Sequence, residues 1–211
     1  RPRHCAKKNT ASGKHGPGKT RLKPCGIWLV ACSHWASSVA SDASSATRWC
    51  QRRAGMASAV LPLDGTRKNW RKALPSGTQR VIIDAPAGAM ERDLEDFLDI
   101  ADAVVVPIQP SALDIEASVR FVESLGKHPR VRKGKLRVGL LGNRLKPHTN
   151  ASQQALEILR SWPFPLVAQL RDSQAYVVLT GLGKSLFDYH SAQVREHQAD
   201  WEPLLHWLKK D

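Results

Sequence analysis

The sequence has no apolar run close to the ~18–20 residues that a membrane-spanning helix needs. Residues 1–8 also lack the apolar segment at the centre of a secretory signal peptide, so we expect no signal peptide. With 42% hydrophobic and 24% charged residues, the 211-residue chain is too apolar for wholesale disorder and long enough to bury a core. These observations predict a soluble cytoplasmic protein.

Metal-binding patterns are also scarce. The four cysteines form no C-x-x-C pair, and the eight histidines include no H-E-x-x-H spacing. A zinc site is therefore poorly supported, and free thiols in a reducing compartment are the simpler interpretation.

Acidic residues are rare at the start of the chain. Residues 1–53 contain eleven Lys or Arg and a single acid, Asp42, whereas residues 54–211 contain 21 basic and 18 acidic residues. The formal net charge of +13 predicts attraction to phosphate, in nucleic acid, a nucleotide or an anionic membrane; the alternative is a basic, well-solvated surface. The apolar residues of the first stretch keep neither a period of 2 nor one of 3.6.

The remainder of the chain alternates strand and helix patterns. Short β-branched runs bounded by Gly, Pro or Asn predict buried parallel strands at residues 80–84, 103–108 and 136–141. Apolar residues at helical spacing predict helices at residues 90–101, 113–125, 151–162 and 199–209.

This alternation predicts one α/β domain over residues 1–211, in which residues 1–50 are atypical and partly disordered. We expect a mainly parallel sheet with helices on both faces, in three layers. Ligands of such folds bind beyond the carboxyl ends of the strands, where Asp84, Gln109 and Asn143 follow the apolar runs.

Residues 13–20 match the phosphate-loop pattern G-x-x-x-x-G-K-S/T in full. Its glycines would let backbone N–H groups point at phosphate oxygens, with Lys19 on the β- and γ-phosphates and Thr20 on Mg²⁺. The alternative is a flexible basic loop, because no strand pattern precedes Gly13 and Pro24 falls where the following helix should continue.

The run that ends at Asp84 is typical of a Walker B strand, whose terminal acid holds the Mg²⁺ shell through water. The alternative role for this acid is to cap the helix that follows. The two motifs favour each other, because a phosphate loop requires such an acid.

Three ordered segments then resemble the ParA/MinD-type partitioning ATPases. They are the hydrophobic-Asp-x-Pro-Ala-Gly run that contains Asp84, the segment 101–114 (ADAVVVPIQPSALD), and the segment 140–144 (LLGNR). Residues 176–187 are similar to the closing segment of the family, so the resemblance covers residues 79–190 well and residues 1–50 poorly.

The resemblance implies a P-loop NTPase-like fold, ATP and Mg²⁺ as cofactors, and roles for particular residues. Lys14 matches the signature lysine that reaches the nucleotide of the partner subunit in an ATP-dependent homodimer. Asp84 matches the Walker B acid, and Asn143 matches the asparagine at the adenine edge. The nucleotide-binding residues implied are Gly13, Gly16, Gly18, Lys19, Thr20 and Asn143, with Thr20 and Asp84 at the metal.

The resemblance also implies a function. It is that of an ATP hydrolase in plasmid or chromosome partition, whose ATP-bound dimer binds DNA without sequence preference and whose slow hydrolysis releases it. A centromere-binding adaptor would stimulate hydrolysis, and the protein would be cytoplasmic and nucleoid-associated, with no membrane partner.

Two departures from the family pattern leave alternatives open. First, His15 replaces a glycine, which puts a Cβ where backbone approaches phosphate. Second, the family's D-x-D-P-Q-G switch has no match near residues 39–46, so Asp42 alone could serve as the acid that positions the attacking water. The alternatives are a catalytically impaired DNA-binding or adaptor protein without turnover, and a related synthetase of the same superfamily.

Residues 127–146 contain eight Lys or Arg and no acid. Such a cluster is typical of non-specific DNA binding, and the DNA-binding residues we expect are Arg130, Arg132, Lys133 and Lys135. The alternative is a solvated loop before a strand.

The apolar stripe near the end of the chain, made of Trp201, Leu204, Leu205 and Leu208, predicts core packing in preference to a membrane-binding helix. Trp162, Tyr176 and Phe187 are likewise expected in the core.

Overall fold

The computed structural model describes residues 27–31, 60, 63, 69–76, 78, 80–85 and 91–209. Five strands in this part of the chain form one parallel sheet in the order β2-β1-β3-β4-β5. The strands are β1 (Ile27–Ala31), β2 (Val81–Ala85), β3 (Ala103–Ile108), β4 (Arg137–Leu145) and β5 (Leu166–Arg171).

Helices connect and cover these strands. They are η2 (Trp70–Ala73), α2 (Glu91–Leu98), α3 (Ala112–Lys127), α4 (Pro129–Arg132), α5 (Asn150–Ser161), α6 (Gln174–Gly181), η3 (Leu186–Asp188) and α7 (Ala192–Lys209). Thr149 and Ser173 cap α5 and α6, because their side chains accept hydrogen bonds from the first-turn N–H groups of Ser152 and Ala175.

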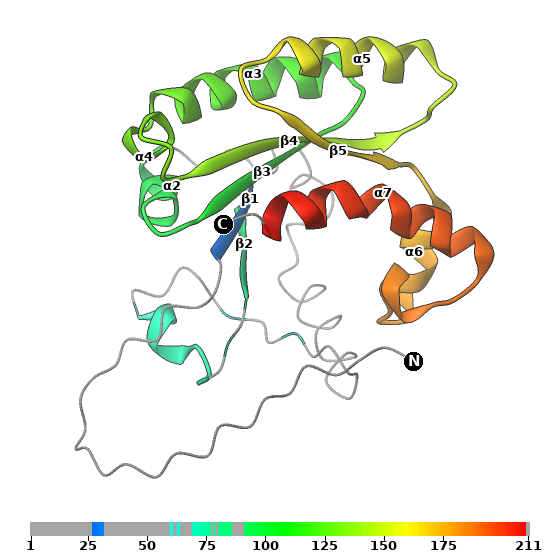
Figure 1. The fold of residues 1–211 in the computed structure, drawn as a ribbon, viewed down its shortest axis with the longest axis horizontal. Helices are drawn as coiled ribbons and strands as arrows, with labels where there is room; N and C mark the ends of the chain where they lie inside the picture. Colours follow the sequence, from blue (N-terminus) through cyan, green and yellow to red (C-terminus); the bar gives the residue numbers. More distant parts are fainter. Residues whose placement is uncertain are drawn as a thin grey trace.

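The strand order determines which face each helix covers. From β2 to β3, β4 and β5 the chain moves across the sheet in one direction, and right-handed crossovers then place α2, α3 and α5 on the same face. Helix α7 follows the last strand and packs on the opposite face (Figure 1). The predicted α/β class, with a parallel sheet between two layers of helices, is confirmed.

The central strand β3 shows why its sequence reads as a continuous apolar run. Val104, Val106 and Ile108 pack into the core shared with α2, α3 and α5, whereas Ala103 and Val105 pack into the core under α7. A parallel strand that is buried on both faces needs apolar residues at every position.

The observed elements extend the prediction at β1, β5, α6 and α7. Strand β1 lies between β2 and β3, although the apolar pattern of residues 1–53 did not indicate it. Strand β5 and helix α6 were not predicted either. Helix α7 begins at Ala192, seven residues before the expected start.

Trp201, Leu204 and Leu208 of the terminal stripe pack in the core, as expected, whereas Leu205 is only half-buried and lies outside the core clusters. Leu204 and Leu208 are buried against β3, β4 and β5, with Trp201 beside them. Trp162 and Tyr176 are partly buried against core residues. The expectation for Phe187 is wrong, because 49% of it is exposed: in the short helix η3 the buried residue is Leu186. Within the described ranges, no helix combines the length and apolarity that crossing a membrane requires.

Gly139 of β4 allows α7 to lie close to the sheet. A Cβ at this position would stand 2.8 Å from a methyl of Val167 and 3.1 Å from the ring of Trp207. Arg137 holds the same end of α7, since its guanidinium donates to the carbonyl of Trp207 (2.7 Å) and lies 5.1 Å from the centre of the Trp207 ring.

We expect Gly139→Ala to lower the free energy of unfolding by about 1–3 kcal/mol, because the added methyl forces Trp207 or β5 to move. Gly126→Ala is the matched control. Its Cβ would meet only Phe164, at 3.9 Å, and alanine favours the helix by up to ~1 kcal/mol. Urea denaturation of the two variants tests this, and equal midpoints would contradict it.

Candidate functional site at the carboxyl edge of the sheet

Parallel pairing brings the three predicted edge residues to the same side of the molecule. Asp84 is one residue from the end of β2, Gln109 directly follows β3, and Asn143 lies near the end of β4. Through the register, Asp84 pairs with Val30, Val30 with Val105, and Val105 with Gly139. Asn143 is therefore three strands away from Asp84 and four residues further along, about 20 Å from it at standard strand spacings.

Asp84 is an exposed residue of β2. Desolvation by partial burial raises the pKa of its carboxyl above the ordinary value. The ionised form is therefore disfavoured by desolvation, and a cation nearby would restore it. Once ionised, the Asp84 carboxylate is the type of ligand that suits Mg²⁺, which one or two carboxylates commonly hold while it keeps several waters.

A bulge shapes the end of β4. The pairing with β5 shifts register between Gly142 and Leu145, and Arg144 adopts a left-handed backbone with φ of 52°. The Arg144 N–H donates to Asn143 Oδ1 at 3.0 Å, and Arg144 Nε lies 3.3 Å from Asp172 Oδ1. Bulges of this kind redirect side chains next to functional sites, and here the bulge orients Asn143.

The loop after β3 is held by a buried acid. Asp114 Oδ2 accepts a hydrogen bond of 2.7 Å from the Gln109 N–H, and only 4% of Asp114 is exposed. This contact fixes Gln109 at the carboxyl edge. The sequence offered a signal for this role, since Asp114 lies in the first turn of α3, where an acid is favoured by the helix dipole.

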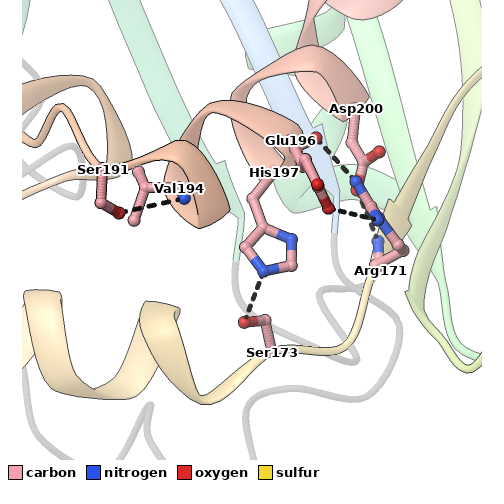
Figure 2. A network of polar contacts seen from close by, with 7 residues as sticks. All are labelled: Arg171, Ser173, Ser191, Val194, Glu196, His197 and Asp200. Atoms are coloured by element: carbon pink, nitrogen blue, oxygen red, sulfur yellow. Dashed lines mark hydrogen bonds and ion pairs between the residues drawn. The ribbon is translucent and has the colours of Figure 1, made fainter.

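The segment after β5 is tied to α7 on both sides of Asp172 (Figure 2). Arg171 Nε donates to Asp200 Oδ2 at 2.8 Å, and an Arg171 Nη2–H donates to the Glu196 carbonyl. Ser173 Oγ lies 3.0 Å from His197 Nε2. Asp172, which holds Arg144, is thus fixed between two anchored neighbours.

Seven predicted site residues lie outside the described residues: Gly13, Lys14, Gly16, Gly18, Lys19, Thr20 and Asp42. Chain order still shows to which end of β1 the glycine motif, the phosphate-loop match at residues 13–20, is connected. Residues 13–20 precede β1, so they are joined to the amino end of that strand, whereas Asp84 is near the carboxyl end of its neighbour β2.

The predicted DNA-binding residues lie at the other edge of the sheet. Arg130 and Arg132 belong to α4, and Lys133 and Lys135 to the turn that leads into the amino end of β4. Arg130 donates to the carbonyls of Leu98, Ala101 and Lys135, so its guanidinium joins α2 to this turn. Arg132, Lys133 and Lys135 are exposed.

Acids that are distant in sequence lie beside this basic turn. Arg130 contacts the end of α2 and the residues after it, a stretch that carries Glu95, Asp96, Asp99 and Asp102. Asp99 Oδ1 is 3.9 Å from His128 Nε2. The sequence of residues 127–146 alone therefore suggests a more positive electrostatic potential than this part of the surface has, because nearby acids partly offset its charge.

Among the residues that the structure describes, no three His, Cys, Asp or Glu side chains gather as metal ligands. Among the described residues, Asp84 offers carboxylate oxygens near the carboxyl end of β2, and these fit a magnesium ion whose other ligands are phosphate oxygens.

Solved structures of other proteins have a similar fold. A protein assigned to plasmid partition in Borrelia burgdorferi B31, solved with AMPPNP, superposes with a TM-score of 0.54 at 13% identity, over 86% of this chain and 87% of that chain. The MinD cell division protein of Aquifex aeolicus gives 0.53 at 12% identity, over 88% and 98%. This chain has the ParA/MinD-type ATPase fold. Scans against protein-family models and curated proteins find no match.

We expect Asp84→Asn to stabilise the domain at pH 7 and to have no effect below about pH 4. The raised pKa means that the folded state prefers the protonated carboxyl, so ionisation opposes folding as the pH rises through the folded-state pKa. Below the ordinary pKa of ~3.9 the wild-type side chain is neutral in both states.

Urea midpoints of Asp84→Asn and of wild type at pH 7 and pH 3.5 test this expectation, with Glu157→Gln on the exposed face of α5 as the control. An asparagine variant that is less stable than wild type at pH 7 would argue that Asp84 has a stabilising partner instead.

Proposed function

We propose that this protein is a nucleotide-dependent partition ATPase. It binds ATP and Mg²⁺ at the carboxyl edge of its sheet, forms a homodimer in the ATP state, and then binds DNA without sequence preference. Hydrolysis returns it to the free state. A centromere-binding adaptor would stimulate that step, and the protein would work in the cytoplasm on the nucleoid.

The observation that carries this proposal is the pair of residues Asp84 and Asn143 at one edge of a sheet with the ParA/MinD-type fold. Their separation of about 20 Å suits a ligand with a metal-bearing polyphosphate at one end and a base at the other. In the proposal Asn143, next to the bulge at Arg144, contacts the base, and the ionised carboxylate of Asp84 contacts the cation; the raised pKa of Asp84 supports a nearby positive charge in the bound state.

The glycine motif can reach this edge even though it precedes β1. The seven residue steps from Thr20 to Ile27 span up to about 24 Å when extended, whereas β1 is only about 13 Å long. In the proposal Lys19 binds phosphate oxygens, Thr20 and Asp84 hold the magnesium, Lys14 reaches the nucleotide of the second subunit, and Asp42 orients water. ATP itself supplies the phosphoryl group for transfer.

The chain order specifically favours the second candidate, an adaptor that keeps the fold and a basic surface without turnover. A phosphate loop ordinarily leaves the carboxyl end of its strand, and residues 13–20 are joined to the amino end of β1. The proline at position 17 also removes one N–H from the loop.

We expect Lys19→Ala and Asp84→Asn each to weaken binding of magnesium AMPPNP by about tenfold or more, because each removes a charged contact to the polyphosphate or its metal. Isothermal titration calorimetry measures this, with Lys23→Ala as the control for loss of a nearby positive charge. Wild-type affinity in both variants would refute the site. If wild type binds the nucleotide but releases no phosphate from ATP, the result would favour the second candidate, the adaptor without turnover.

For DNA, we expect the triple change of Arg132, Lys133 and Lys135 to Gln to reduce the slope of log affinity against log salt by roughly 2 to 3, because each lost phosphate contact accounts for ~0.9. The matched control changes three exposed arginines on other helices, Arg120, Arg160 and Arg195, to Gln. Fluorescence anisotropy with a random duplex provides the slopes, and equal slopes for the two triple variants would exclude α4 as the DNA surface.

A further inference from the structure

One polar side chain interrupts the apolar stripe of helix α7. Val194, Trp201, Leu204 and Leu208 follow one another at helical spacing and pack into the cores under this helix. His197 takes the remaining position of the stripe, three residues after Val194 and four residues before Trp201. An apolar side chain would suit core packing at this position, so the choice of histidine calls for another explanation.

The ring of His197 depends on a single hydroxyl. Its Nε2 lies 3.0 Å from Oγ of Ser173, the residue that caps α6, whereas its Nδ1 is buried and has no hydrogen-bond partner among the described residues. If the ring stayed in place and the contact with Ser173 broke, neither nitrogen would have a protein partner within this part of the chain. Such a loss is costly for a polar group that is shielded from water, so the contact ties the start of α6 to α7.

A second contact ties the residue on the other side of Asp172 to the same helix. Arg171 Nε donates to Asp200 Oδ2 at 2.8 Å, and the Arg171 backbone N–H donates to the same oxygen at 3.3 Å. Only 16% of the Asp200 side chain is exposed, so water screens this ion pair less than an ordinary surface pair. His197 and Asp200 are three residues apart on one face of α7, and both point toward the segment that follows β5 (Figure 2).

Asp172, which lies between these two anchors, is connected to the candidate base end of the site. Its Oδ1 accepts from Arg144 Nε at 3.3 Å, and its backbone N–H donates to the Leu145 carbonyl at 2.8 Å. The Arg144 N–H in turn donates to Asn143 Oδ1 at 3.0 Å. Because 63% of the Arg144 side chain is exposed, its ion pair with Asp172 holds little by itself. The geometry at Asn143 is therefore set jointly by β4 and by the segment that α7 holds.

We propose that His197 and Asp200 are positioning residues for the base of the bound nucleotide, a role that rests on the proposed function. In this role they touch no part of the nucleotide. They hold the segment after β5, and through it they keep Asn143 in the orientation that recognises the base. Hydrogen bonds are directional, so a displacement of about 0.5 Å or 10–20° at Asn143 weakens the contacts that favour one base over another. The phosphate end at Asp84, about 20 Å away, is not affected.

The test compares AMPPNP with GMPPNP, which share the ribose and the triphosphate analogue and differ only in the base. Calorimetry on the full chain with magnesium gives both dissociation constants, and their ratio is the base preference. We expect wild type to prefer AMPPNP at least about tenfold. Ser173→Ala, His197→Ala and Asp200→Asn should each reduce this preference at least about threefold, because each removes a hydrogen bond that holds the segment after β5.

Matched controls separate positioning from general damage. Ser173→Thr keeps the hydroxyl and should retain the wild-type preference. His206→Ala and Glu202→Gln make the corresponding changes at exposed positions of α7 and should also leave the preference unchanged. Asp84→Asn acts at the phosphate end, so it should weaken both nucleotides by the same factor and leave their ratio as in wild type.

Three results would overturn the positioning role: an unchanged ratio in the three variants, an equal weakening of both nucleotides in them, or a wild type that binds the two nucleotides alike. The last result would leave the phosphate end of the proposed function in place. A wild type that binds neither nucleotide would refute the proposed function itself, and the positioning role with it. Circular dichroism checks that each variant is folded, and Ser173→Ala, which removes a single oxygen atom, carries the test if Asp200→Asn does not fold.

Discussion

The parallel pairing of β2, β1, β3 and β4 is the constraint on which the rest of the structure depends. Because every strand in this sheet runs the same way, all the carboxyl ends meet at one edge and all the amino ends at the other. The molecule therefore has two chemically different ends. One carries Asp84, Gln109 and Asn143, and the other carries the basic turn at α4.

The carboxyl edge is built by contacts that reach it from several elements. Asp114 fixes the loop after β3, Arg144 joins the bulge in β4 to Asp172, and Arg171 and Ser173 anchor the following loop to α7. Leu204 and Leu208 pack α7 against the sheet, and α7 carries Asp200 and His197, the partners of Arg171 and Ser173. A site made of loops is thus supported by a helix on the far face.

Residue patterns predicted the parts of this fold that repeat with a clear period. The β-branched runs gave β3 and most of β2 and β4, and helical spacing gave α3 and α5, because burial on one or both sides imposes those patterns. Strand β1 is as long as β2 but has only two β-branched residues, Ile27 and Val30, and β5 carries Gln169 among its apolar residues. Their places come from pairing with neighbours that are distant in sequence.

Some features of the candidate site could be predicted from the sequence, and others could not. Polar residues at the carboxyl ends of strands could be predicted, and Asp84 and Asn143 lie among the last residues of β2 and β4. The left-handed backbone of Arg144 could not, since arginine has no preference for it. Nor could the contacts of Arg130, whose acceptors are backbone carbonyls up to 32 residues away.

The acids at the end of α2 and the bases at α4 form a local electric dipole on the surface. A uniform positive patch attracts a polyanion from any angle, but a dipole also exerts a torque on an approaching one. A charged rod would be turned so that it crosses α4 while avoiding α2. For a rod that approached this face, the orientation relative to the sheet axis would then be set before any contact formed.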